Sequence, residues 1–400
     1  MYNSFVGKNE FSFIAKLVVL YYAISPFLYL LRTLSGDVGI TSFILRFFEP
    51  FLLVSTLFSC FLQNRFKLNA YILTFFLLGF YGVIIAIVQD NRLVDIVAGY
   101  SHFMTGILLF IYFYSSGKNL NIDRFMMVLS YATLSCCLAV LGFMYCMPYI
   151  LGFHIYLGLA CQVLIMVFFY NLHKRRFFQC ILSVLLIILS GKRGVLVALL
   201  IGYILSLIFL LHRAKLKNIV KLLFAFVLIS SIVVLVLPVT SEQLIKKYTY
   251  NEQATVDDYS AGRWNEVTSA YEGWVNNVEN VILGSGFGFT YTYIHFLTKL
   301  ADTEDYKNVH FSYLNPIIIF GVPVATLYYI CLGLLFIRLF RRVDPSISYL
   351  KWSSLTYLIY ACFVFNLFDE PIFWMINGVL FSYSDSVKRN VSLRANCESY

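Results

Sequence analysis

The feature that most constrains this chain is a succession of long apolar runs joined by short polar connections. A helix needs about 20 largely apolar residues to cross a bilayer, and by that measure the sequence predicts about twelve spans. They lie at residues 11–31, 39–62, 69–89, 94–115, 124–146, 149–170, 176–191, 193–211, 219–240, 311–339, 348–368 and 371–385. With 60% hydrophobic and 13% charged residues, the chain lacks the polar surface of a soluble protein. We therefore predict an all-α fold, a polytopic membrane helix bundle.

The basic residues predict which side each connection faces. Lys and Arg accumulate in the short cytoplasmic loops of membrane proteins. If the N-terminus is cytoplasmic, the clusters at 174–176, 213–217 and 338–342 all fall on that side. Both termini are then cytoplasmic, and the long polar segment 241–309 is periplasmic or extracellular. The net charge of +9 arises mainly from such clusters, so we do not expect a nucleic-acid partner.

The long polar segment divides the chain into residues 1–240 with nine spans, a loop domain at 241–309, and residues 310–400 with three spans and a cytoplasmic tail. Inside the loop, the run RWNEVTSAYEGWVNN predicts an amphipathic helix. Its apolar face would carry Trp264, Val267, Tyr271, Trp274, Val275 and Val278, with Glu266 elsewhere around the helix. Such a helix either packs on the bundle, lies in the membrane interface or faces a substrate.

Three further patterns argue against cofactor and metal sites. The nine cysteines show no disulfide or zinc spacing. The GSGFG run at 284–288 follows no recognisable strand, so we interpret it as a turn that ends the loop helix and not as a nucleotide-binding loop. Asp302, Glu304 and Asp305 match no strong metal-ligand motif and are interpreted as a solvated turn. We expect no metal and no cofactor.

Four polar side chains on the periplasmic side are candidates for a functional site. Lys192 and Arg193 stand between two glycines, where they either bind a diphosphate or anchor the chain at lipid phosphates. Arg263 opens the loop helix and is either a ligand to an anion or a solvated surface residue. His310 lies where the loop re-enters the membrane, and a histidine can take a proton from a hydroxyl near neutral pH. His295 is the alternative histidine within the loop.

Four segments in this order resemble the O-antigen polymerase and ligase family of bacterial inner-membrane proteins. They are SGKRGVLVALL at 190–200, GRW at 262–264, LGSGFG at 283–288 and HFSYLNPIIIFGVP at 310–323. The resemblance covers the C-terminal half of the chain. It implies a helical, GT-C-like glycosyltransferase in the inner membrane that needs no metal. Its donor would be an oligosaccharide linked to undecaprenyl diphosphate. Membrane lipids and a chain-length regulator would be its further partners.

The same resemblance implies roles for the candidate residues. Arg193 and Arg263 would hold the donor diphosphate, with Lys192 as a neighbouring contact, and His310 would deprotonate or orient the acceptor hydroxyl. Phe311 follows the histidine, where members of the family often have Asn.

Two activities within the family and two from other classes are the alternatives for this chain. It favours a polymerase, which transfers a growing glycan to a lipid-linked repeat unit, because divergent chains rich in Phe and Tyr are typical of that group. A ligase that transfers the glycan to lipid A-core is the nearest alternative. A lipid-linked oligosaccharide flippase would be expected to show two related halves, and the sequence shows no convincing repeat. A non-enzymatic membrane receptor would not require the two arginines or the histidine.

The predicted topology is tested by cysteine labelling at Asp257, inside the long polar segment. We expect a membrane-impermeant maleimide to label Asp257→Cys in intact spheroplasts of a variant that lacks the native cysteines. Labelling that required permeabilised membranes would put the segment in the cytoplasm and contradict the orientation.

Overall fold

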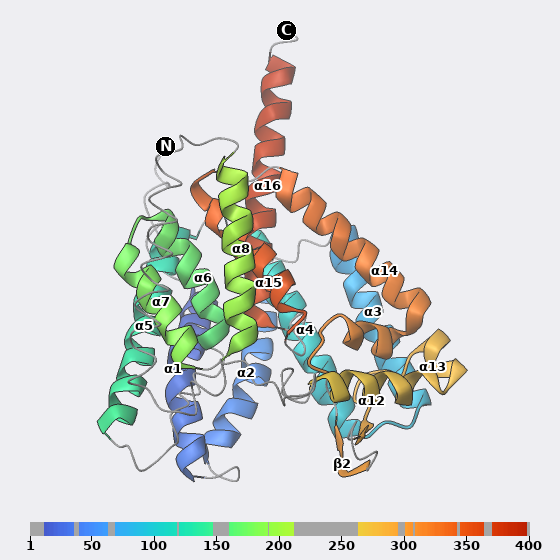
Figure 1. Ribbon diagram of the computed structural model, residues 1–400. Coiled ribbons are helices and arrows are strands. Elements are labelled where there is room, and N and C mark those ends of the chain that lie inside the picture. Colours follow the sequence, from blue (N-terminus) through green and yellow to red (C-terminus); the bar gives the residue numbers. More distant parts are fainter. Residues whose placement is uncertain are drawn as a thin grey trace. The chain divides into compact units, whose positions relative to one another are not determined.

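A computed structural model describes residues 12–35, 40–62, 69–117, 120–146, 160–190, 192–211, 263–294, 301–306, 309–341, 345–363 and 370–397 (Figure 1). Their helices are α1 Phe13–Ser35, α2 Ile40–Leu62, α3 Ala70–Val88, α4 Leu93–Ser116, α5 Ile122–Cys146, α6 Ala160–His173, α7 Phe177–Leu189, α8 Arg193–Leu211, α12 Arg263–Val275, α13 Val278–Leu283, α14 Leu314–Arg341, α15 Ser348–Tyr360 and α16 Pro371–Cys397. A 3-10 turn at Pro345–Ile347 precedes α15, and β1 Tyr291–Ile294 and β2 Ala301–Tyr306 complete the elements.

The helices agree with a multi-pass membrane protein. Among the described residues, five helices are long and apolar enough to cross a membrane, and they contain Phe13–Leu31, Ala70–Val88, Leu93–Ser116, Ile122–Phe143 and Leu314–Phe340. Shorter apolar helices are found at Pro50–Leu62, Cys161–His173, Phe177–Leu189 and Arg193–Ile208. The predicted span at 219–240 lies outside the described residues, as do Asp257 and His295. The total of twelve spans therefore stays a prediction.

The small sheet corrects two expectations from the sequence. Strands β1 and β2 pair antiparallel, with Thr292 opposite Asp305, so the fold is not purely helical. The stretch from Asp302 to Asp305 is a strand and not the predicted turn. Its charged residues give little sign of a strand, because the structure there is imposed by pairing with β1. Strand β1 itself, YTYI in the sequence, carries the alternating β-branched and aromatic residues that favour a strand.

Contacts divide the chain into two compact units. Unit 1 contains Met1–Phe48, Leu120–Glu252 and Trp352–Tyr360. In it, α1 packs on α5, while α6 packs on α5, α7 and α8. A buried hydrogen bond from Asn171 to Ser130 joins α6 to α5, with the amide Nδ2 2.8 Å from the hydroxyl. Such polar pairs are one means by which helices adhere in a bilayer, where apolar contact alone discriminates little.

Unit 2 contains Glu49–Asn119, Gln253–Lys351 and Ala361–Tyr400, and its helical core is the pair α4 and α16. Trp374 of α16 is buried and packs edge-on against Phe75 of α3 and Phe110 of α4. Gly106 makes room for this ring, since a Cβ at that position would lie 2.3 Å from the indole. Small residues thus permit the close approach of α4 and α16, as is usual between membrane helices.

Helix α14 of unit 2 is interrupted near its start. Gly321 has a φ of 72° and a ψ of 164°, and Pro323 follows two residues later. Proline has no N–H, so the carbonyl of Ile319, four residues earlier, loses its helical donor. The N–H of Gly286 replaces it, 3.0 Å from that carbonyl. An unsatisfied backbone group in a membrane costs several kcal/mol, and the bond from Gly286 removes that cost. The glycine loop is therefore held against the broken helix.

The same glycine loop, Gly284–Gly288, lies against the junction of α3 and α4. Asn91 donates from Nδ2 to the carbonyls of Ser285 at 2.8 Å and Phe287 at 2.9 Å. A Cβ on Gly286, whose φ is 71°, would lie 2.2 Å from the backbone nitrogen of Ala86. The predicted turn after the loop helix is confirmed, and the direct approach of two backbones explains why glycine occupies it.

Substitution of Gly286 by alanine should destabilise unit 2. The new Cβ would overlap the α3 backbone and force an unfavourable φ, with an expected loss of about 2–4 kcal/mol of folding free energy. Gly333→Ala in α14 is the matched control, because a Cβ there meets no atom within 4 Å. Thermal unfolding of the two purified variants in detergent should separate them. Equal melting temperatures would contradict the proposed backbone contact.

Candidate functional site

The first turn of α12 carries two charged side chains on one side of the helix, Arg263 and Glu266. They are three residues apart, so they lie one turn above each other. Arg263 donates from Nη1 to the carbonyl of Phe363 at 2.6 Å, which fixes the direction of its guanidinium. Glu266 is buried, with 7% of its surface exposed. A carboxylate in the first helical turn also interacts favourably with the helix dipole.

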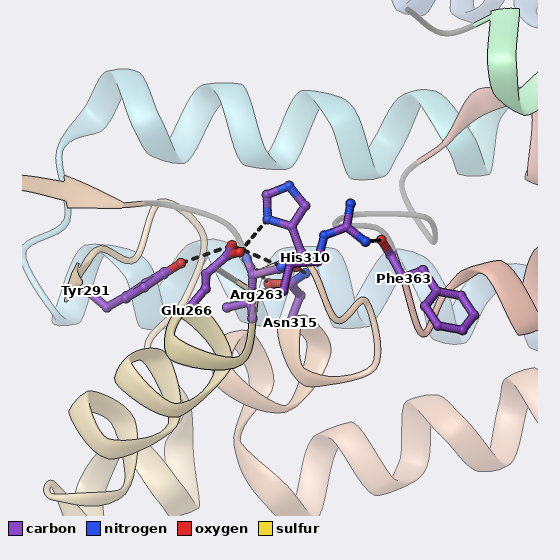
Figure 2. A network of polar contacts seen from close by, with 7 residues as sticks. Arg263, Glu266, Tyr291, His310, Asn315 and Phe363 are labelled. Atoms are coloured by element: carbon purple, nitrogen blue, oxygen red, sulfur yellow. Dashed lines mark hydrogen bonds and ion pairs between the residues drawn. The ribbon is translucent and has the colours of Figure 1, made fainter. Parts of the chain in front are cut away.

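Glu266 is the centre of a polar network that includes His310 (Figure 2). Its Oε2 lies 2.5 Å from Nδ1 of the His310 ring. Its Oε1 accepts from the backbone N–H of His310 at 3.1 Å and from the Tyr291 hydroxyl at 3.2 Å. Both carboxylate oxygens therefore have donors, and these donors offset the cost of burying the charge. One side chain thus holds the backbone and the ring of His310.

The turn that carries His310 is also fixed from its far end by Asn315. The Asn315 amide donates to the Val309 carbonyl at 3.0 Å and accepts from the Val309 N–H at 3.3 Å. This reciprocal pair joins Val309 to the first turn of α14 and so closes the turn between them. In addition, the N–H of Ser312 donates to the carbonyl of Ala361 at 2.9 Å, so the segment after α15 supports the same turn.

Beneath the network lies a hydrophobic cluster that joins α12, β1 and the start of α14. Its buried members are Ala270, Trp274, Phe289, Tyr291, Val309, Leu314 and Ile318. Trp274 closes one side, with its indole N–H donating to the carbonyl of Asn280 at 2.9 Å. Because Tyr291 and Val309 belong to the cluster, apolar burial sets the position of two residues that touch the polar network.

The predicted amphipathic helix exists, and only part of its apolar face is buried. Trp274 is buried, whereas Trp264 and Tyr271 are about half exposed, at 52% and 48%. The buried face instead contains Asn265, Glu266, Ser269, Ala270 and Trp274. A helical pattern assigns the apolar face from the polarity of the side chains alone, without their partners. Here the polar Glu266 is buried because Tyr291 and His310 provide it with donors.

This geometry gives the imidazole a defined chemistry. When neutral, the ring donates Nδ1–H to Glu266, and its lone pair then resides on Nε2. When protonated, it forms an ion pair with the same carboxylate. The side chain is 36% exposed, so it is within reach of solvent. A histidine held in this way can accept a proton at Nε2 while the carboxylate stabilises the resulting positive charge.

The structure brings two of the sequence-predicted site residues into one neighbourhood. Arg263 and His310 are both in unit 2, and both adjoin the first turn of α12. Lys192 and Arg193 are in unit 1, at the beginning of α8, where the carbonyl of Lys192 accepts the first helical N–H groups. The connection between α7 and α8 is where the sequence predicts it. The convergence of these three cations and the histidine on a single pocket stays a prediction.

Glu266 is the site residue that sequence reasoning missed. Its charge suggested solvent, and it lies off the expected apolar face. A signal was available, since Arg263 and Glu266 are spaced i,i+3 in a loop helix with few other charges, and such a pair shares a face. Its histidine partner is 44 residues away in sequence. Only the folded chain identifies that partner.

Metal binding receives no support from the described part of the chain. Within those ranges, no group of three or more His, Cys, Asp or Glu side chains is arranged to hold a metal ion. The side chains of Asp302, Glu304 and Asp305 are not among those described. The expectation that the reaction needs no metal stays a prediction.

Comparison with known proteins bears on the identity of this site. A comparison with curated proteins found no match. Residues 178–329, less than half of the chain, match a family model described as O-antigen ligase. This region contains all four segments of the resemblance, together with Glu266 and Tyr291. The match supports placing the chain in the O-antigen polymerase and ligase family of multi-pass membrane proteins.

Proposed function

We propose that this protein is an O-antigen polymerase of the bacterial inner membrane, with its site on the periplasmic side. The family implies a glycosyltransferase-like enzyme that acts on lipid-linked glycans. The observation that carries the proposal is the His310 ring held by Glu266 next to the turn that bears Arg263. A base and a cation in one place are what transfer from a sugar diphosphate requires.

The cations act on the leaving group. In the proposed reaction the bond between the anomeric carbon and the diphosphate oxygen breaks, and negative charge accumulates on the phosphates. Arg263, with Arg193 and Lys192, binds those oxygens, since a guanidinium offers a planar fork of donors. Fixed positive charge at this position lowers the barrier without metal assistance. Undecaprenyl diphosphate is the product that leaves.

His310 acts on the acceptor. Its Nε2 takes the proton of the acceptor hydroxyl while the hydroxyl oxygen forms the new bond to the anomeric carbon. The hydroxyl proton ends on the imidazole, and the electron pair of the broken bond ends on the diphosphate. A single direct displacement of this kind inverts the anomeric configuration. The acceptor is a lipid-linked repeat unit in a polymerase and lipid A-core in a ligase.

Different observations favour a polymerase over a ligase and over a flippase. The family match does not separate a ligase from a polymerase, so the preference over a ligase depends on the divergent, Phe- and Tyr-rich character of the chain. A flippase gains no support from the family match. A chain-length regulator remains an expected partner of a polymerase.

Deletion of the gene, followed by electrophoresis of lipopolysaccharide, tests the proposed function. A polymerase defect should leave core carrying one repeat unit, because ligation continues without polymerisation. A bare core would instead indicate a ligase or a flippase, and lipid-linked polymer accumulating in the outer leaflet of the inner membrane would then identify the ligase. Complementation with the intact gene is the control.

Substitution of the proposed base and cation should abolish transfer without loss of protein. We expect His310→Ala and Arg263→Ala to lower the turnover of purified enzyme by about 10²–10⁴-fold, the usual contribution of a general base or an electrostatic contact. The matched controls are His102→Ala and Arg92→Ala, both at exposed positions. Glycan ladders and immunoblots of membranes give the same comparison in cells. Full activity of His310→Ala would remove the base assignment.

A further inference from the structure

Glu266 is a buried carboxylate that the family-based roles leave unassigned. Its carboxylate is bonded from two different parts of unit 2, the strand β1 and the turn before α14. The Tyr291 hydroxyl and the backbone N–H of His310 both donate to Oε1, and they would hold the loop without the imidazole. The contact between Oε2 and Nδ1 is additional, and it is the shortest of the three at 2.5 Å.

The two contacts to Oε1 determine where Oε2 points. A carboxylate is planar, so donors at Oε1 restrict rotation of the group and leave Oε2 directed at the ring. The backbone of His310 is held by the same carboxylate, and that of Val309 by Asn315. The His310 ring is therefore held in one position relative to Glu266. This is the arrangement by which a second residue sets the tautomer of a histidine.

We propose that Glu266 is the positioning residue of His310, a role that rests on the proposed function of His310 as base. Glu266 accepts the Nδ1–H, which keeps the lone pair on Nε2. It stays ionised when Nε2 takes the acceptor proton, and its charge stabilises the imidazolium. After the product leaves, the imidazolium returns that proton to solvent through its exposed edge. Tyr291 keeps the carboxylate in place and takes no part in proton transfer.

The proposal is tested with Glu266→Gln, which keeps the size of the side chain and removes its charge. A glutamine can turn its NH₂ group toward Nδ1 and so select the opposite tautomer, with Nε2 protonated. We expect kcat to fall by about 10²–10⁴-fold with a much smaller change in KM. Glu266→Asp, which keeps the charge, should recover part of the loss. Glu272→Gln, at an exposed position of the same helix, is the matched control.

A double-mutant cycle separates positioning from general support of the fold. If Glu266 acts through His310, then Glu266→Gln should cost nothing further in a His310→Ala background. A purely structural role would lower activity in both backgrounds by the same factor and would overturn the proposal. Wild-type kcat in Glu266→Gln would overturn it as well. Melting temperatures of all variants identify any loss that comes from unfolding.

A second measurement does not depend on transferase activity. Diethylpyrocarbonate acylates an unprotonated imidazole nitrogen, and mass spectrometry of the peptide that contains His310 gives the rate. We expect slower modification of His310 in Glu266→Gln than in the wild type, with the rate at His102 unchanged as an internal reference. Unchanged reactivity of His310 would overturn positioning. Full turnover by His310→Ala, together with slowed modification, would instead reject the proposed base and leave the contact established.

Discussion

The structure of unit 2 depends on the satisfaction of backbone hydrogen bonds within a membrane-embedded helix. Pro323 and Gly321 break α14, and a bilayer offers no water to the carbonyl that is left without a donor. The N–H of Gly286 fills that place. The polar loop is thereby attached to the hydrophobic helices at a fixed point. The glycine loop and the strand β1 that follows it are positioned from this attachment.

The position of the site depends on this attachment, because the glycine loop leads into β1. Strand β1 comes directly after the glycine loop and delivers Tyr291 to the hydrophobic cluster under α12. The turn before α14 delivers Val309 to the same cluster, so His310 emerges beside the first turn of α12. Glu266 then links the two segments through both of its oxygens. A hydrophobic cluster sets the approximate arrangement, and directional hydrogen bonds set the orientation of the imidazole.

The arrangement also shows why the polar residues of a membrane enzyme cannot be read individually. Arg263 and Glu266 form one pair in sequence, yet Arg263 bonds a backbone carbonyl after α15 and Glu266 bonds a histidine before α14. Each charge is held by a different segment of unit 2. In a medium that penalises unpaired charge, such partners decide which side chains are buried and which are solvated.

The sequence by itself determined the class of this protein, because hydropathy along the chain follows directly from the energetics of the bilayer. It also identified the glycine turn, the loop helix and the junction before α8, since each has a local signal. Only the tertiary structure decided that α12 buries Glu266 in preference to Trp264, that Asp302 to Asp305 form a strand, and that the glycine turn completes α14. These outcomes depend on partners distant in sequence, and a local pattern carries no information about a donor 44 residues away.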